Sequence, residues 1–106
     1  MTHMIDIAKD FSRNPAGRHL VDGPNSGQRF RESYLAPALR AAPGVIEVDL
    51  TGALGFGSSF LEEAFGGLVR ADGFAPTELH QRLRIKSELR TYVDKIWRYV
   101  DEARPN

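Results

Sequence analysis

Apolar residues recur along the chain with two different periods, and each period predicts one kind of element. In residues 45–50 the apolar side chains alternate, so that Ile46, Val48 and Leu50 share one face of a predicted strand. Residues 82–86 alternate in the same way, with arginine and lysine on the opposite face. Positive charge on a strand discourages pairing with another sheet, so we expect residues 82–86 to lie at a sheet edge.

Elsewhere the apolar residues lie three and four positions apart, which is the spacing of a helix with one buried face. One helix is predicted to begin at Ser26, which can cap its first turn, and to be kinked or divided at Pro37, because proline lacks a backbone donor. Further helices are predicted at about 59–71 and 88–103, with a short helical turn around 77–81.

The first 25 residues have a weaker pattern. Met4, Ile5 and Ile7 predict a first strand, and residues 18–21, between two turn-rich clusters, predict a second strand that would form an N-terminal hairpin with it. Strands that alternate with helices indicate an α/β fold. We therefore expect a small mixed β-sheet of four or five strands with helices packed on it. The length of 106 residues indicates a single domain, 1–106.

Charge and composition exclude several classes of function. The 14 basic residues balance the 14 acidic ones, so no overall field attracts nucleic acid or a membrane, and neither is expected as a partner. The chain has no cysteine, which excludes disulfides and thiol chemistry, and its three histidines lie too far apart in sequence for a local metal motif. No apolar run is long enough for a signal peptide or a membrane span, so a cytoplasmic location is expected.

The most informative stretch runs from a strand end through a glycine-rich turn to two serines that open a helix. Free backbone donors and the positive end of a helix dipole meet at such a place, which favours anions. Asp49 is expected either to accept hydrogen bonds from the following loop or to line a site beside Ser58. Ser59 and Glu62 have the spacing of a capping box, so we expect Ser59 to cap the helix. In the same helix, Gly66 and the glycine after it are expected to permit a close contact with a neighbour.

One function compatible with this turn is the binding of a small anionic ligand. The turn Gly52–Ser59 could bind a phosphate or a nucleotide, with Arg18 or Arg29 as a clamp for the anion, although its glycines do not have the spacing of a known phosphate loop. An enzyme is not expected, because Ser58 has no predicted base in register and no carboxylate pair or metal-ligand set is evident. Ser58 can also be read as a plain polar residue at the helix entrance.

Two segments of the turn resemble the STAS domain of sulfate transporters and anti-sigma factor antagonists. Asp49-Leu50-Thr51-Gly52 is similar to its strand end, and Gly57-Ser58-Ser59-Phe60-Leu61 is similar to its helix start, at matching spacing. Gly57 stands where that family usually has aspartate, and Phe60 where it has glycine. These departures fit a sister family better, the bacterial STAS-like domain of unknown function, which the chain also resembles in residues 15–18, 23–31, 58–66 and 96–97.

The resemblance implies a regulatory module that docks to other proteins, with no enzymatic activity and no cofactor. By analogy with the anti-sigma factor antagonists, its partner would be an anti-sigma-like ATPase of the histidine-kinase fold. That partner would phosphorylate the first serine of the pair, Ser58, and so switch binding. The candidate residues for partner or anion binding are Asp49, Thr51, Gly57, Ser58, Ser59, Arg18 and Arg29.

Overall fold

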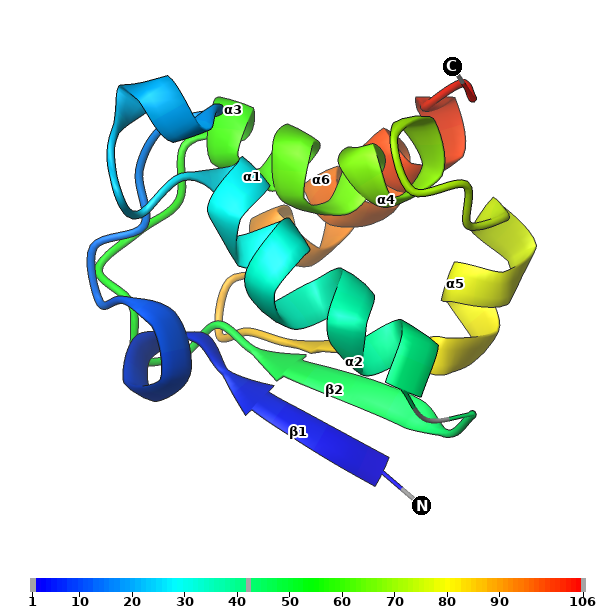
Figure 1. Ribbon diagram of the computed structural model, residues 1–106. Coiled ribbons are helices and arrows are strands. Elements are labelled where there is room, and N and C mark those ends of the chain that lie inside the picture. Colours follow the sequence, from blue (N-terminus) through cyan, green and yellow to red (C-terminus); the bar gives the residue numbers. More distant parts are fainter. Residues whose placement is uncertain (1, 42, 106) are drawn as a thin grey trace.

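The structure, a computed structural model, describes residues 2–41 and 43–105, and its sheet has three parallel strands (Figure 1). The strands are β1 (Thr2–Asp6), β2 (Val45–Asp49) and β3 (Leu83–Lys86), in the order β1-β2-β3. Ile5 lies beside Val48, and Val48 beside Ile85. The strands predicted at 45–50 and 82–86 are confirmed, and β3 lies at an edge of the sheet as expected.

The predicted N-terminal hairpin is wrong, and with it the mixed sheet of four or five strands. β1 pairs with β2 in parallel, and residues 18–21 form no strand. The backbone of that segment is instead satisfied locally. The carboxylate of Asp22 accepts hydrogen bonds from the N–H groups of Arg18 and His19, and the carbonyls of Gly17 and Arg18 accept from the first N–H groups of the next helix. With these groups paired, the segment has no need of a sheet partner.

Helical elements fill most of the remaining chain. They are η1 (Ile7–Phe11), η2 (Leu20–Asp22), α1 (Gly27–Phe30), η3 (Arg31–Leu35), α2 (Ala36–Ala41), α3 (Ser58–Leu61), η4 (Glu62–Gly66), α4 (Gly67–Arg70), α5 (Pro76–Arg82) and α6 (Arg90–Glu102). α1, η3 and α2 follow one another without a break, as do α3, η4 and α4, so each set makes one continuous helix whose middle part has wider π-type turns. The helices predicted at 59–71 and 88–103 are therefore present: the first begins and ends one residue earlier than predicted, and the second is shorter by one or two residues at each end.

The first long helix begins as predicted and continues past its proline. Ser26 is the N-cap, and its hydroxyl accepts a hydrogen bond from the N–H of Arg29. Ala36, the residue before Pro37, keeps helical angles of φ −63° and ψ −44°, so the expected division of the helix is wrong. The N–H of Ala36 bonds the carbonyl of Arg31, five residues earlier, and this wider turn accommodates the proline ring and its missing donor.

The helices cover one face of the sheet, and the other face meets solvent (Figure 1). On the covered face Ile46, Val48 and Leu50 are at most 2% exposed. On the opposite face, Met4 of β1 is 58% exposed and Arg84 of β3 is also exposed. The fold therefore has two layers, with its core between the sheet and the helices. Within the described residues, no helix is long and apolar enough to cross a membrane.

Glycines allow the helices to approach closely. A methyl group on Gly27 of α1 would lie 2.4 Å from the carbonyl oxygen of Phe60, and one on Gly67 would lie 2.5 Å from the Nε of Arg31. Gly66 approaches the backbone of Tyr99 in α6. The close contacts expected at Gly66 and Gly67 are confirmed.

Candidate functional site

Asp49 ends the central strand and fixes the start of the glycine-rich turn. Its Oδ1 accepts a hydrogen bond from the N–H of Thr51 at 2.9 Å, and its Oδ2 lies 3.9 Å from the Nζ of Lys86. Partial burial raises the pKa of Asp49, but the hydrogen bonds from Thr51 and the charges of Lys86 and Lys9 outweigh it, so the net pKa lies below its usual value. Of the two roles predicted for Asp49, its hydrogen bond to the loop is confirmed.

The rest of the turn is held by neighbouring segments. The N–H of Leu54 bonds the carbonyl of Arg13 at 2.9 Å, and the N–H of Phe56 lies 3.4 Å from the hydroxyl oxygen of Tyr92 in α6. The turn is thus tied to the N-terminal loop on one side and to the last helix on the other. This anchoring fixes the position at which the next helix begins.

Gly57 is the N-cap of the helix that follows, with φ −76° and ψ 157° and no side-chain cap. The first helical hydrogen bond joins the N–H of Leu61 to the carbonyl of Gly57 at 3.2 Å. Ser58 and Ser59 lie inside the first turn and are exposed. The predicted capping box is therefore wrong. Ser59 lies two positions after the N-cap, and the carboxylate of Glu62 binds arginines instead.

Exposed apolar side chains lie on both sides of this helix start. Leu54 is 77% exposed and Leu89 is 57% exposed, and both line a small pocket of about 140 Å³ with Phe56 and Tyr92. On the other side, Val21 is 91% exposed in the η2 turn, which Figure 1 shows beside the beginning of α3. Contiguous exposed apolar side chains such as Leu54 and Leu89 indicate a contact surface, and Val21 is a single exposed residue beside it. We call the exposed serines together with Val21, Leu54 and Leu89 the Ser58 corner.

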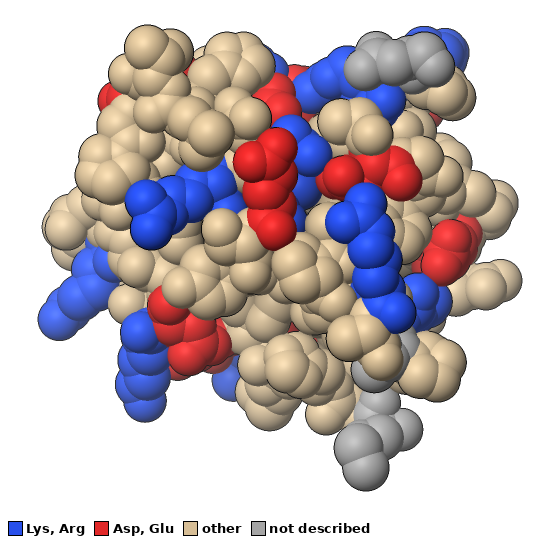
Figure 2. All heavy atoms as spheres, viewed as in Figure 1, with Lys and Arg blue, Asp and Glu red and all other residues tan. Residues whose placement is uncertain are grey.

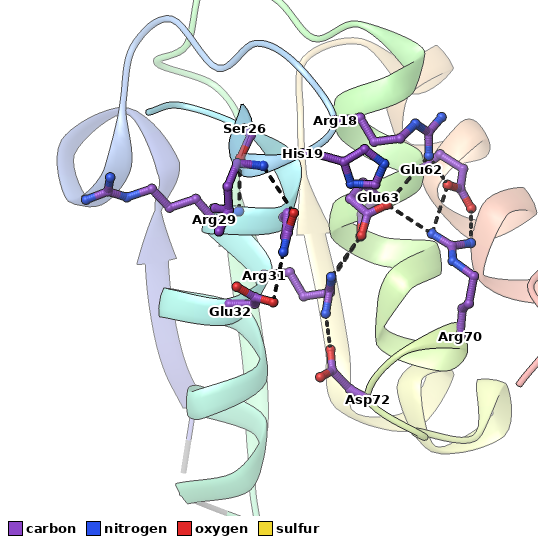
Figure 3. Close-up of polar contacts among 12 residues, drawn as sticks. Arg18, His19, Ser26, Arg29, Arg31, Glu32, Glu62, Glu63, Arg70 and Asp72 are labelled. Atoms are coloured by element: carbon purple, nitrogen blue, oxygen red, sulfur yellow. Dashed lines mark hydrogen bonds and ion pairs between the residues drawn. The ribbon is translucent and has the colours of Figure 1, made fainter. Parts of the chain in front are cut away.

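A network of charged residues, which the sequence analysis did not identify, lies behind the Ser58 corner. Figure 3 shows Arg31 pointing from the first long helix toward Glu63 and Asp72. Its guanidinium lies 2.8 Å from a carboxylate oxygen of each. On the other side of the network, Glu62 is paired with Arg18 and, at 2.7 Å, with Arg70. Figure 2 likewise shows acidic and basic side chains next to one another on the viewed face.

Burial makes this network more than a surface feature. Arg31 is only 4% exposed and the side chain of Glu63 8%. Burial lowers the pKa of Arg31, but its hydrogen bonds to Asp72 and Glu63 outweigh that effect and leave it raised. Gly67, four residues after Glu63, leaves the space that the guanidinium fills. A small residue one turn after a carboxylate was the only signal in the sequence that pointed to this arrangement.

The network predicts how stability depends on pH. Burial raises the pKa of Glu62, but hydrogen bonds from Arg70 and Arg18 outweigh it, so its folded-state pKa lies below the ordinary value of 4.5. Ionised Glu62 therefore stabilises the fold above about pH 4.5, and that contribution is lost as the pH falls through the lower folded-state pKa. We expect Glu62→Gln to cost about 1 kcal/mol or more at pH 7, and the difference from the wild type to shrink below pH 4.5. Urea denaturation at a series of pH values measures both; a difference that does not change with pH contradicts the prediction.

The two arginines predicted as an anion clamp do not converge on the turn. Figure 3 shows the side chains of Arg18 and Arg29 pointing in different directions. Arg18 is paired with Glu62 and lies 3.7 Å from Glu63, so its charge is already balanced. Arg29 is exposed and has no ion-pair partner among the described residues. Within residues 2–41 and 43–105, no group of three or more metal-ligating side chains could hold a metal ion.

Comparison with known proteins identifies the family of this fold. A search of the curated proteins and a search of the solved structures gave no match. The family described as a STAS-like domain of unknown function (DUF4325) matches residues 26–89, which include both long helices, the central strand and the whole turn at the Ser58 corner. This match covers more than half of the chain. The protein therefore belongs to the family of STAS-like domains of unknown function.

Proposed function

We propose that this protein is a regulatory module without enzymatic activity that binds a protein partner across the Ser58 corner. The observation that supports this most directly is the exposure of Val21, Leu54 and Leu89 around the start of one helix. Burying such side chains against a partner gives about 25 cal/mol for each square ångström of apolar surface removed from water. The partner we propose is an anti-sigma-like ATPase of the histidine-kinase fold.

We propose further that phosphorylation of Ser58 by this partner releases the complex. A phosphoserine carries about −1.5 to −2 charge and three strong acceptors. In the first turn of a helix this charge is favourable for the protein itself, because the N-terminal end of the helix dipole is positive. Against an apolar partner surface the same charge is costly to desolvate.

Two substitutions at Ser58 test the switch. With the purified ATPase encoded nearest to this protein, we expect wild type and Ser58→Ala to bind with similar Kd and Ser58→Asp to bind at least about tenfold more weakly. Isothermal titration calorimetry gives the affinities, and mass spectrometry after incubation with ATP locates the phosphate. Thr77→Asp is the matched control, because it adds the same charge to an exposed position in the first turn of α5.

The outcomes separate docking from switching. Equal binding by Ser58→Ala and Ser58→Asp would contradict the proposed phosphorylation switch. Unchanged partner binding by Leu54→Asp would contradict docking at the Ser58 corner. A thermal shift with phosphate or a nucleotide alone would favour the anion-binding function instead, since a ligand at 100 times its Kd adds about 2.7 kcal/mol of stability.

A further inference from the structure

The edge strand β1 presents backbone groups that lack a partner. The N–H of Asp6 donates to the carboxylate of Asp10 at 2.8 Å, so it points away from β2. Backbone groups of a strand point to alternate sides, so those of Met4 and Thr2 point outward as well. Within the described residues, β2 is the only strand paired with β1, and no other backbone bond reaches Met4. The outer edge of β1 is thus open at Thr2 and Met4, and it is closed at Asp6 by Asp10 and by the helical turn that follows.

The opposite edge of the sheet is protected, which makes the open edge of β1 distinctive. At β3 the guanidinium of Arg84 donates to the carbonyls of Leu83 and Gln81, and Lys86 adds a second positive charge. Charged side chains of this kind are the usual means by which proteins prevent pairing at sheet edges. The first four residues that the structure describes in β1 include no lysine, arginine, aspartate or glutamate.

A groove runs beside this open edge. Its volume is about 570 Å³, and it is lined by β1 on one side and by the first long helix on the other. The lining residues are His3, Met4, Ile5, Asp10, Ser33, Tyr34, Pro37 and Ala38. Apolar side chains thus follow the edge, and Met4 on the solvent side of the sheet is 58% exposed. A strand added here would gain both backbone hydrogen bonds and apolar contact.

We propose that the open edge of β1 pairs with β1 of a second copy of this chain, in antiparallel orientation about a two-fold axis at Met4. The two Met4 residues would then exchange both of their backbone hydrogen bonds. Thr2 of each copy would lie opposite Asp6 of the other, whose N–H is held by Asp10 and whose carbonyl begins the next helical turn, so Met4 makes the hydrogen bonds of the pair. The two three-stranded sheets would become one sheet of six strands, a common size for a sheet. The pairing uses none of the residues of the Ser58 corner.

The side chains around the edge fit a second copy in this register. His3 lies on the groove side of β1, and in the pair it approaches Asp10 of the other copy, which can accept a hydrogen bond from the imidazole. The two Asp6 residues would be about 13 Å apart, because four residues of extended chain separate their positions at about 3.3 Å each. That exceeds the screening length of about 8 Å in physiological salt, so their repulsion is weak. The exposed Met4 side chains would cover one another.

Charge substitutions at the two-fold axis test both the interface and its register. We expect the wild type to sediment as a dimer, and Met4→Lys and Met4→Glu each to raise the dimer Kd at least about tenfold, because each places like charges opposite one another. An equimolar mixture of the two variants should dimerise again, since opposite charges then meet. Analytical ultracentrifugation measures each state, and circular dichroism confirms that the variants are folded.

Leu54→Lys is the matched control, because Leu54 is exposed but lies outside β1. A dimer that Leu54→Lys leaves intact supports the proposal. A wild type that remains monomeric at its highest soluble concentration overturns it, as does a mixture of Met4→Lys and Met4→Glu that stays monomeric. Loss of the dimer in Leu54→Lys would place the interface elsewhere and would also overturn it.

Discussion

Arg31→Met is expected to lower the free energy of unfolding by about 3–5 kcal/mol, because it leaves buried carboxylate charge without its main partner. Arg31 donates to the carboxylate and the backbone carbonyl of Glu63 and to Asp72, at 2.8, 3.1 and 2.8 Å. All three bonds disappear together. For a domain of this size the loss corresponds to a fall in Tm of about 12 °C or more, which thermal denaturation followed by circular dichroism measures.

Two further variants show whether buried charge is the cause. Arg40 binds the other oxygen of Asp72 at 3.1 Å but is 56% exposed, so Arg40→Ala should cost at most about 1 kcal/mol. Adding Glu63→Gln to Arg31→Met should restore part of the stability, because it removes the unpaired charge. A cost for Arg31→Met no larger than that for Arg40→Ala would show that the network contributes little.

Gly27→Ala is expected to destabilise the protein by about 2–3 kcal/mol, although the same change inside a helix is ordinarily stabilising by about 1 kcal/mol. The new methyl group would lie 2.4 Å from the carbonyl oxygen of Phe60 and 3.2 Å from the backbone nitrogen of Ala64. Neither atom can move without shifting the helix that carries the Ser58 corner. The two long helices would have to separate.

Gly57→Ala is the control for this prediction. Gly57 has an ordinary φ of −76°, and no atom lies within 4 Å of the position that a methyl group would take. Its substitution should change the stability by less than about 0.5 kcal/mol. Denaturant titration of both variants gives the comparison. Equal stability of Gly27→Ala and the wild type would mean that the helices can separate at little cost.

The sequence predicted those elements whose apolar pattern is long and regular. The alternation in residues 45–50 and the helical spacing in 59–71 and 88–103 placed these elements to within a residue or two. Ser26 was correctly identified as a cap, because capping depends only on the residues that follow within one turn. Family membership followed from short motifs at fixed spacing, and the profile match over residues 26–89 bears it out.

The errors came where the backbone had several ways to satisfy its hydrogen bonds. Residues 18–21 have the pattern of a strand, but their backbone groups form hydrogen bonds with Asp22 and with the start of the first long helix instead of with a neighbouring strand. Pro37 was expected to kink or divide that helix, yet the helix continues, and a wider turn before Pro37 accommodates its missing N–H donor. Ser59 was two positions away from the true N-cap, Gly57. These choices depend on small differences between neighbouring arrangements, which a single sequence does not resolve.

The family, the alternation of strands and helices, and the serine at a helix start all follow from the order of the amino acids. That β1 runs parallel to β2, that its outer edge is open, and that Arg31 is buried between Glu63 and Asp72 became clear from the folded chain. The reason is physical. Periodicity records which side of an element meets the core, because that depends on positions a few residues apart. Strand order and buried ion pairs join residues more than thirty positions apart, and only the packing of the whole chain brings them together.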